Sequence, residues 1–222
     1  MRRAARRCPR PRECCEPLIV LLDYGAGNLA SVHKALRHCG AEVTVTSDAK
    51  GLGDASGAIL PGVGAFGEAM ARLESAGLVQ PLRAYIAQDR PFLGICLGLQ
   101  LLFESSEESP GVEGVGVFPG RVARLPENPG LKIPHMGWNQ LRRRRECWAL
   151  AGVAEGAYAY FVHSYVVAPA DEQLIATTTE HGVEFVSSVT RGRLYACQFH
   201  PEKSQQVGLT ILRNFVVLCG RS

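Results

Sequence analysis

The sequence predicts an α/β fold in which a mostly parallel central sheet is flanked by helices and continued by an antiparallel extension. In the first hundred residues, short apolar runs alternate with segments of helical periodicity, the pattern of strands buried on both faces of a parallel sheet. From residue 117 onwards, apolar and polar residues alternate in short runs, as in antiparallel strands. The 222 residues contain no internal repeat or interdomain linker, so we expect one folded domain.

The elements of the parallel part follow one another at short intervals. Strands are predicted at residues 18–22, 42–46, 58–60 and 91–95. Asn28 caps a helix that ends at Gly40, and further helices are predicted at residues 66–76, 78–88 and 97–103. The glycine-containing segment 61–64 and Cys96 each follow a predicted strand, at the strand end where α/β proteins bind ligands.

The second half is predicted to contain a loop, several strands and a final helix. Residues 105–116 are polar and rich in glycine, which indicates a surface loop. Antiparallel strands are predicted within residues 117–195, including 157–167 and 183–190, and a helix at residues 205–218. The four arginines at 142–145 could attract a phosphate, but a solvated strand end is the favoured interpretation.

Positive charge is concentrated at the N-terminus. Residues 1–17 are rich in arginine and proline, show no periodicity, and contain six of the 24 basic and two of the 21 acidic residues. The remainder therefore has a net charge of −1, which argues against nucleic-acid binding. We interpret residues 1–17 as a disordered tail without the features of a targeting signal, and residues 18–222 as the folded domain.

No apolar stretch reaches the roughly 18 residues needed to cross a bilayer. The eight cysteines show no metal-ligand spacing, and we expect them to be reduced thiols. We therefore expect a cytoplasmic protein that has no membrane partner and needs no metal or cofactor.

Cys96 lies in Gly94-Ile95-Cys96-Leu97-Gly98, between a predicted strand and a predicted helix. A nucleophile at such an elbow occupies a strained backbone position, and small neighbouring residues allow the turn to pack. The first N–H groups of the following helix favour a thiolate and an oxyanion. The alternative is a buried structural cysteine, a common environment for this residue.

His200 follows an apolar-alternating run and is separated by one proline from Glu202. Histidine can take a thiol proton near neutral pH, and a nearby carboxylate can orient the ring and stabilise the imidazolium. Glu202 could fold back onto His200 in this way. A solvated histidine in a turn is the alternative, but the elbow at Cys96 favours the catalytic interpretation.

The two motifs together resemble those of the class I glutamine amidotransferases, which carry a Cys-His-Glu triad on an α/β fold. Further segments are similar to one branch of these proteins, the HisH family of glutaminase subunits of imidazole glycerol phosphate synthase. These segments are residues 23–28, 61–64, 134–139, 160–165 and 200–204. The resemblance extends from Leu18 to Leu218.

The resemblance implies a role for each matching residue. Cys96 would form a γ-glutamyl thioester, His200 would move the protons, and Glu202 would orient His200. The N–H of Leu97 follows the nucleophile directly and would be one oxyanion donor; the second would come from Val63 or Gly64. The residues implied to bind L-glutamine are Gly62, Gln100, Ser164 and Tyr165.

The resemblance also implies a partner that receives the ammonia. This would be a HisF-type (β/α)8-barrel cyclase subunit, forming a heterodimer that makes imidazole glycerol phosphate and aminoimidazole carboxamide ribonucleotide in histidine biosynthesis. Trp138 and Lys203 are predicted to contact this partner. For Trp138 a place in the core is an equal alternative.

Three other functions are compatible with parts of the pattern. They are a glutaminase subunit of another amidotransferase, such as the pyridoxal phosphate synthase type, a stand-alone γ-glutamyl hydrolase or cysteine peptidase, and a non-catalytic interaction protein. The adjacent His163 and Ser164 do not indicate a serine hydrolase, because neighbouring residues on a strand point to opposite faces.

We predict that removing residues 1–16 leaves thermal stability and activity nearly unchanged, because an unpatterned arm buries little apolar area. Thermal unfolding of the full-length and shortened chains measures this. A melting temperature lower by several degrees in the shortened chain would show that the tail is a structural element.

Overall fold

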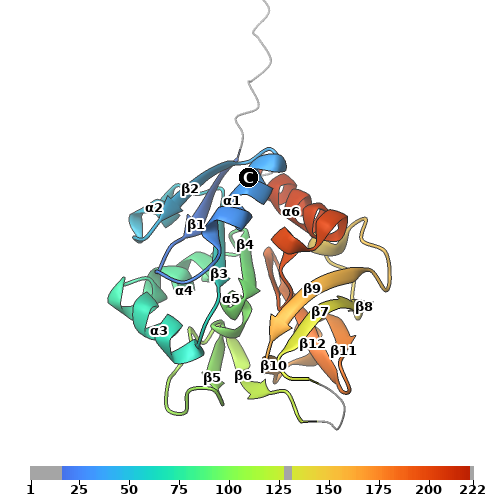
Figure 1. Cartoon of the computed structure of the whole chain (residues 1–222). Coiled ribbons are helices and arrows are strands. Elements are labelled where there is room, and N and C mark those ends of the chain that lie inside the picture. The colour runs from blue at the N-terminus through green and yellow to red at the C-terminus, as the bar shows by residue number, and fades with distance from the viewer. Residues whose placement is uncertain (1–16, 128–131, 221–222) are drawn as a thin grey trace, which may run out of the picture.

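A computed structural model describes residues 17–127 and 132–220 of the chain, so the predicted tail at residues 1–16 lies outside the described residues. Within the described residues, eleven strands form one mixed sheet (Figure 1). Its main order is β2-β1-β3-β4-β13-β12-β10-β6-β5, and β11 and β8 continue from β12. The strands β7 and β9 form a separate two-stranded sheet.

Five neighbouring strands make up the parallel half of the large sheet. They are β2 (Glu42–Thr46), β1 (Leu18–Leu22), β3 (Gly57–Gly62), β4 (Phe92–Cys96) and β13 (Leu194–Cys197). Every residue of β3, β4 and β13 is buried. The continuous apolar runs of the sequence therefore correspond to strands covered on both faces, as predicted.

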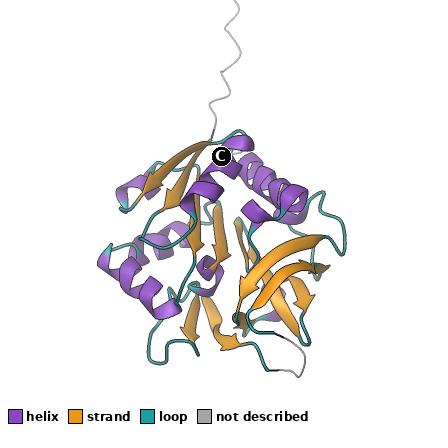
Figure 2. Cartoon of the chain, in the orientation of Figure 1, coloured by secondary structure: helices purple, strands orange, loops and turns teal. Residues whose placement is uncertain are grey.

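Helices cover both faces of this parallel half (Figures 1 and 2). On one face, α1 (Leu29–His38) and α6 (Gln205–Cys219) pack against alternate strand residues such as Ile19 and Leu21. On the other face, α3 (Phe66–Ser75) and α4 (Val79–Ala87) pack against Val20 and Leu22. The short helix α2 (Lys50–Gly53) contributes Leu52 to this second core.

The antiparallel half begins where β12 (Glu184–Arg191) pairs with β13. From β12 the sheet divides into two branches. One branch consists of β10 (Tyr165–Pro169), β6 (Phe118–Arg124) and β5 (Phe103–Ser106), which pairs in parallel with β6. The other consists of β11 (Ile175–Glu180) and β8 (Arg142–Arg143). The separate sheet consists of β7 (His135–Gln140) and β9 (Tyr158–His163). The 3-10 helices are η1 (Trp148–Leu150), η2 (Glu172–Leu174) and η3 (Pro201–Lys203).

The predicted helix at residues 97–103 is wrong in length. Helix α5 spans only Leu97–Gln100, and Phe103 begins strand β5. The helix ends early because Leu101 and Leu102 accept hydrogen bonds from the backbone N–H groups of Val115 and Val117. The predicted loop at residues 105–116 is therefore packed against the chain that precedes it, and its first two residues belong to β5.

Two other predicted boundaries also differ from the structure. Strand β3 runs two residues beyond the predicted end, because Pro61 and Gly62 lie in register with Ile95 and Cys96 of β4. The predicted strand region at 157–167 is divided at Ser164 into β9 and β10, which belong to different sheets. The end of β9 and this bend lie beside the elbow at Cys96, since Val162, His163 and Ser164 line the same cavity as Cys96.

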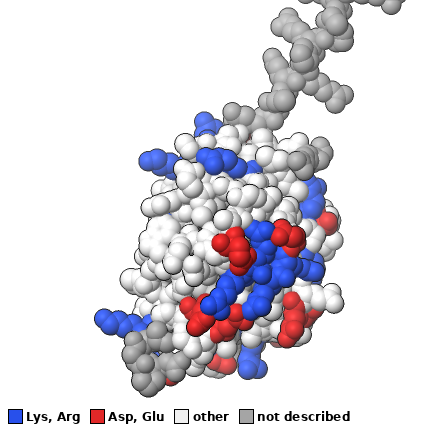
Figure 3. Space-filling view, turned by 90° about the vertical axis from the view of Figure 1, so that its right-hand side faces the viewer, with Lys and Arg blue, Asp and Glu red and all other residues white. Residues whose placement is uncertain are grey.

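The side chains of the four consecutive arginines at 142–145 all pair with acceptor groups of the protein itself. Arg142 pairs with Glu180 at 2.6 Å and Arg143 with Glu146 at 2.7 Å, while Arg144 pairs with Glu184. Figure 3 shows basic and acidic side chains intermingled on one face of the molecule. The interpretation of this segment as a solvated strand end is confirmed, since the first two arginines form β8 and pair with β11.

No helix in residues 17–127 and 132–220 is long and apolar enough to cross a membrane.

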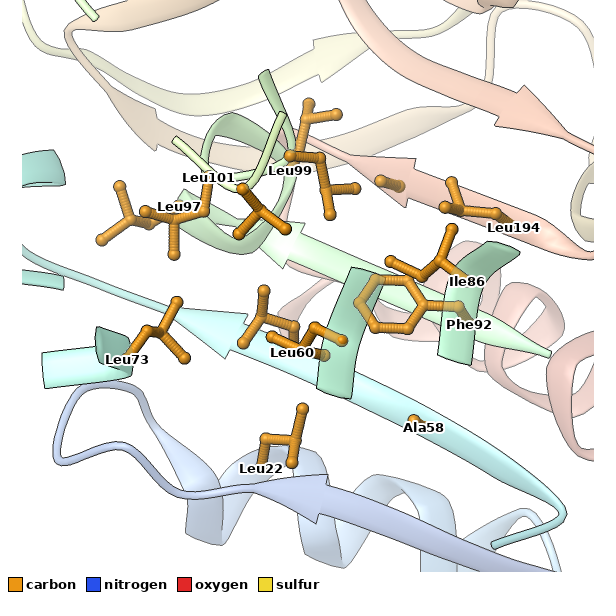
Figure 4. Packing of buried hydrophobic residues seen from close by; sticks show 14 of the residues in the cluster. Leu22, Ala58, Leu60, Leu73, Ile86, Phe92, Leu97, Leu99, Leu101 and Leu194 are labelled. Carbon is orange, nitrogen blue, oxygen red and sulfur yellow. The ribbon is translucent and has the colours of Figure 1, made fainter. Parts of the chain in front are cut away.

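The elbow depends on close packing between α5 and β3. Leu60 of β3 lies beneath Leu97, Leu99 and Leu101 in the hydrophobic cluster shown in Figure 4. A Cβ atom on Gly98 would collide with the backbone carbonyl oxygen of Leu60. Glycine is therefore required at this point of contact, whatever the conformation of the turn.

We predict that Gly98→Ala lowers the free energy of unfolding by about 1–3 kcal/mol, the usual cost of overpacking a well-filled core. Urea denaturation measures this change. Gly53→Ala is the matched control, because a Cβ atom there would meet no other atom within 4 Å. Equal stability of the two variants would contradict the close contact between α5 and β3.

Candidate active site

Cys96 is the last residue of β4 and directly precedes α5. Its backbone has φ of 54° and ψ of −110°, a region that side-chain-bearing residues rarely adopt. Such strain costs on the order of 1–3 kcal/mol and is retained where the surrounding structure enforces it. Two glycines allow the surroundings to approach: a Cβ atom on Gly94 would lie 2.9 Å from that of Ala196, and Gly98 contacts Leu60.

His200 and Glu202 form a buried pair beside the elbow. The Nδ1 atom of His200 lies 2.9 Å from Oε1 of Glu202, and the two side chains are 3% and 1% exposed. Burial alone would lower the pKa of His200, but hydrogen bonding and charge interactions with Cys96 and Glu202 outweigh it and raise the pKa to about 10. The other ring nitrogen, Nε2, is buried and forms no hydrogen bond of ordinary geometry among the described residues. The contact between His200 and Glu202 that the sequence suggested is therefore present, next to the elbow at Cys96.

The turn that carries His200 is fixed by β9. The backbone N–H of His200 donates to the carbonyl oxygen of Tyr160 at 2.9 Å, and the hydroxyl of Ser204 accepts a hydrogen bond from the Tyr160 N–H. The same Ser204 hydroxyl donates to the carbonyl oxygen of His200 at 2.6 Å. A Cβ atom on Gly208 would collide with Pro201, so α6 lies directly against this turn. Sequence reasoning did not identify these supporting roles of Ser204 and Gly208.

A cavity of about 430 Å³ opens between the elbow and the end of β9. It brings together the predicted residues Val63, Gly64, Cys96, Leu97, Gln100, Ser164, Tyr165, His200 and Lys203. It is also lined by residues that sequence reasoning missed, which are Glu108, Pro134, Val162 and His163. Nothing local in the sequence marks Glu108, because its position depends on the packed loop after β5.

Gly62 does not line this cavity, although it was predicted to contact substrate. It lies in register with Cys96, and a Cβ atom there would come within 2.6 Å of the Tyr24 hydroxyl and 2.8 Å of the Leu97 Cβ atom. The Tyr24 hydroxyl donates to the carbonyl oxygen of Pro61 at 2.9 Å. Gly62 thus allows β3 to approach the elbow, and the next residues, Val63 and Gly64, reach the cavity.

Gln100 has its amide nitrogen fully engaged inside the protein. Its Nε2 atom donates to the carbonyl oxygen of Tyr165 and to Oε1 of Gln198, each at 3.0 Å. The side chain is only 5% exposed and borders the cavity. With both N–H groups used, its carbonyl oxygen is the atom that Gln100 can offer to a ligand.

Trp138 lies on the surface, so the alternative that placed it in the core is wrong. Its side chain is 45% exposed, and two other large apolar residues of the same small sheet, Met136 and Tyr158, are 64% and 53% exposed. The Trp138 ring packs edge-on against the ring of Tyr160 at 6.0 Å, and the Lys203 ammonium lies 5.8 Å from the centre of the Tyr160 ring. The two predicted interface residues are therefore brought to one surface.

Two buried histidines, His135 and His163, lie next to each other, and His163 lines the cavity. His135 Nδ1 is 3.1 Å from His163 Nε2, and His163 Nδ1 is 3.0 Å from the carbonyl oxygen of Tyr165. Burial and the neighbouring His181 lower the pKa of His135 to about 4, and burial and His135 lower that of His163 to about 3. Because both nitrogens of His163 are engaged elsewhere, it does not act as a base for Ser164. No three side chains in the described ranges form a metal-binding group.

The chain is similar to known proteins over most of its length. The family model described as glutamine amidotransferase class-I matches residues 20–219. The chain is 51% identical over 197 residues to the imidazole glycerol phosphate synthase subunit HisH of Moorella thermoacetica, covering 89% of this chain and 93% of that protein. It is 52% identical over 197 residues to the subunit of the same name from Aquifex aeolicus, covering 88% and 94%.

Solved structures with lower identity share the fold. A putative GMP synthase subunit from Thermoplasma acidophilum has a TM-score of 0.70 at 20% identity and covers 93% of this chain and 96% of that chain. PurLQS from Thermotoga maritima has a TM-score of 0.69 at 16% identity and covers 91% and 99%. These likenesses concern the fold alone and confirm the predicted α/β class.

We predict that the His135–His163 pair makes the fold less stable in acid. In the unfolded chain a histidine titrates near pH 6.5, whereas in the folded chain these two titrate near 4 and 3. As the pH falls below 6.5, these histidines bind protons in the unfolded state but not in the folded state. The contribution of the pair to the free energy of unfolding is therefore greatest above pH 6.5 and declines towards pH 3. The double variant His135→Phe/His163→Phe should lose less stability than the wild type between pH 7 and 4.5.

Urea denaturation at the two pH values measures this difference. The matched control is His38→Gln, because His38 is exposed at the end of α1. The account is contradicted if the double variant loses as much stability in acid as the wild type and the control.

Proposed function

Because the chain belongs to the class I glutamine amidotransferases and, within them, to the HisH family of glutaminase subunits, we propose that Cys96, His200 and Glu202 hydrolyse L-glutamine. The observation that carries this assignment is the buried His200–Glu202 pair beside a cysteine in strained backbone geometry. Imidazole glycerol phosphate synthase uses such a subunit in histidine biosynthesis. The ammonia produced at Cys96 would be passed on for that synthesis.

The reaction would begin with attack of the Cys96 sulfur on the side-chain amide carbon of glutamine. His200 would take the thiol proton on Nε2 and return it to the departing nitrogen, so that ammonia leaves and a γ-glutamyl thioester remains. Water, deprotonated by His200, would then release glutamate and restore the thiol. Glu202 keeps Nδ1 of His200 engaged, which leaves Nε2 as the nitrogen that exchanges protons.

The raised pKa of His200 suits this role. Hydrogen bonding and charge interactions with Cys96 and Glu202 raise the pKa of His200 to about 10, which favours the protonated ring once it has taken the thiol proton. The imidazolium formed in this way would stabilise the negatively charged sulfur beside it. During attack, negative charge moves from the sulfur to the amide oxygen, where the Leu97 and Val63 N–H groups would receive it.

The cavity supports glutamine as the substrate. Its volume of about 430 Å³ is in the range of sites for small molecules. Gln100 is the last residue of α5, the helix that directly follows Cys96. Its carbonyl oxygen would accept a hydrogen bond from the α-ammonium group of the substrate. Ser164 and Tyr165 also line the cavity, and their backbone groups would hold the substrate's α-amino-acid end together with Gln100.

A HisF-type (β/α)8-barrel cyclase subunit is the proposed partner, and the cytoplasm is the proposed compartment. The exposed apolar residues Met136, Trp138 and Tyr158 offer the kind of surface that anchors a protein interface. Lys203, which borders both this surface and the cavity, would add a charge near its edge. A stand-alone γ-glutamyl hydrolase would not need such a partner, so the effect of the partner distinguishes the two functions.

We predict that Cys96→Ala reduces glutamine hydrolysis by at least about 10⁴-fold, because the reaction loses its nucleophile. Synthesis from added ammonia by the complex with the cyclase should continue, since ammonia can enter from solvent. Glutamate release and product formation measure the two activities. Cys39→Ala, which removes a half-buried thiol, is the control and should retain both. Glutamine-dependent turnover by Cys96→Ala would refute the assignment.

We predict that the isolated subunit hydrolyses glutamine slowly. The cyclase with its nucleotide ligand should raise the rate by about 10²–10³-fold, the factor by which one oxyanion donor usually changes the rate. The reason is the exposed segment at Val63, 44% exposed, whose N–H we expect the partner to reorient. Steady-state glutamate production by the subunit, the complex and the liganded complex tests this. Equal rates in all three would exclude the gating of the oxyanion site but leave the triad intact.

The interface is tested with Trp138→Ala, which should weaken the complex by about 2 kcal/mol if the ring is an anchor. Val217→Ala is the matched control, because Val217 is 51% exposed on α6 and belongs to a different surface. Binding measured by titration calorimetry should change for Trp138→Ala alone. Unchanged affinity in both variants would place the partner elsewhere.

A further inference from the structure

Gln198 is a completely buried polar residue to which neither the triad nor the predicted glutamine site assigns a role. It follows β13 and precedes the triad turn by two residues. Its backbone N–H donates to the carbonyl oxygen of Ser187 at 2.9 Å, which holds the main chain in place independently of the side chain. The side chain is therefore free to serve the site.

The side chain of Gln198 bridges two residues of the cavity. Its Nε2 atom lies 3.7 Å from the sulfur of Cys96, within hydrogen-bonding range for sulfur. Its Oε1 atom accepts a hydrogen bond from Nε2 of Gln100 at 3.0 Å. One buried amide thus contacts the nucleophile and a residue proposed to bind the substrate.

The orientation of this amide follows from its neighbours. The carbonyl oxygen of Tyr165 can only accept a hydrogen bond, so Gln100 must present its Nε2 there. The same Nε2 faces Gln198, which must present Oε1 to it. The remaining end of Gln198, the N–H donor, can then only point to the Cys96 sulfur.

The carbonyl group of Tyr165, which is the first acceptor in this series of hydrogen bonds, is itself held in place by buried histidines. It accepts a second hydrogen bond from Nδ1 of His163, whose Nε2 in turn accepts from His135. Nε2 of His135 accepts from the side-chain amide of Asn139 at 3.2 Å. The direction of every hydrogen bond in this series is fixed. The low pKa values of His135 and His163 keep both rings neutral, so each ring carries a single N–H.

We infer that Gln198 is a further residue of the active site, which donates a hydrogen bond to the Cys96 sulfur and holds Gln100 with its carbonyl oxygen towards the bound glutamine. This inference rests on the proposed glutaminase function. An N–H donor aimed at sulfur stabilises its negative charge, so Gln198 and His200 act on the nucleophile from two sides. Through Gln100, the same side chain positions the group that receives the α-ammonium of the substrate.

Two substitutions separate these effects. Gln198→Met keeps the approximate volume but removes both the donor to sulfur and the acceptor for Gln100. Gln198→Glu keeps an oxygen acceptor for Gln100 and replaces the donor facing sulfur with a carboxylate oxygen. Ser188→Ala is the matched control, because it removes a buried hydroxyl that is hydrogen-bonded to Thr177 of the neighbouring strand β11 at 2.6 Å.

The first readout is the pH profile of Cys96 alkylation by iodoacetamide without glutamine, followed by mass spectrometry of the peptide that contains Cys96. Both Gln198 variants should shift the midpoint to higher pH, by at least about one pH unit for Gln198→Glu, because the sulfur loses a donor or gains a neighbouring charge. Ser188→Ala should keep the wild-type midpoint. If Gln198→Met does not fold, the Gln198→Glu profile decides. Wild-type midpoints in the folded variants would overturn the inference, even if their melting temperatures fall.

The second readout is the KM for glutamine in the complex with the cyclase and its nucleotide ligand. Gln198→Met should raise KM roughly tenfold, the typical effect of one lost hydrogen bond, whereas Gln198→Glu should change it much less. An equal increase in both would show that Gln198 does not act through Gln100. If the wild-type complex releases no glutamate, the proposed function fails, whereas the alkylation profile still tests the contact between Gln198 and Cys96.

Discussion

The close approach of backbone segments around Cys96 is the constraint on which the rest of the site depends. Three glycines make it possible: Gly62 lies against Tyr24 and Leu97, Gly94 against Ala196, and Gly98 against Leu60. Side chains at these positions would push β3, β4 and α5 apart, and Cys96 would then relax from its strained φ of 54°. The two large hydrophobic clusters on either side of the parallel sheet supply the packing energy that holds this arrangement together.

The second organising feature is the path by which distant strands meet at the sulfur. β13 pairs in parallel with β4, so that the segment after β13 carries Gln198 and His200 to the side of Cys96. β9 fixes the backbone of His200, and the bend at Ser164 turns the next strand so that the Tyr165 carbonyl meets Gln100. Buried polar groups are costly unless they are paired, and here each pairing also orients a side chain that we propose to act in catalysis or binding. Stability and orientation are therefore supplied by the same bonds.

Sequence reasoning succeeded where the determining contacts are local. Strands β1 and β2 match their predicted limits, and the proximity of His200 to Glu202 follows from their separation by one residue. It failed where contacts with distant backbone decide the outcome. Helix α5 ends early because Val115 and Val117 donate to the carbonyl oxygens of Leu101 and Leu102, just beyond it. Gln198 was missed for the same reason, since its contact with Cys96 exists only after β13 and β4 pair. The limits of the folded domain remain a prediction.

We propose that the sulfur of Cys96 forms a covalent bond to the γ-carbonyl carbon of glutamine. The most direct test is rapid acid quenching of the complex during turnover, followed by mass spectrometry of the peptide that contains Cys96. A γ-glutamyl thioester on Cys96 should appear before steady state and disappear when glutamine is exhausted. Glutamate formation with no adduct at Cys96, or with the adduct on another residue, would contradict it.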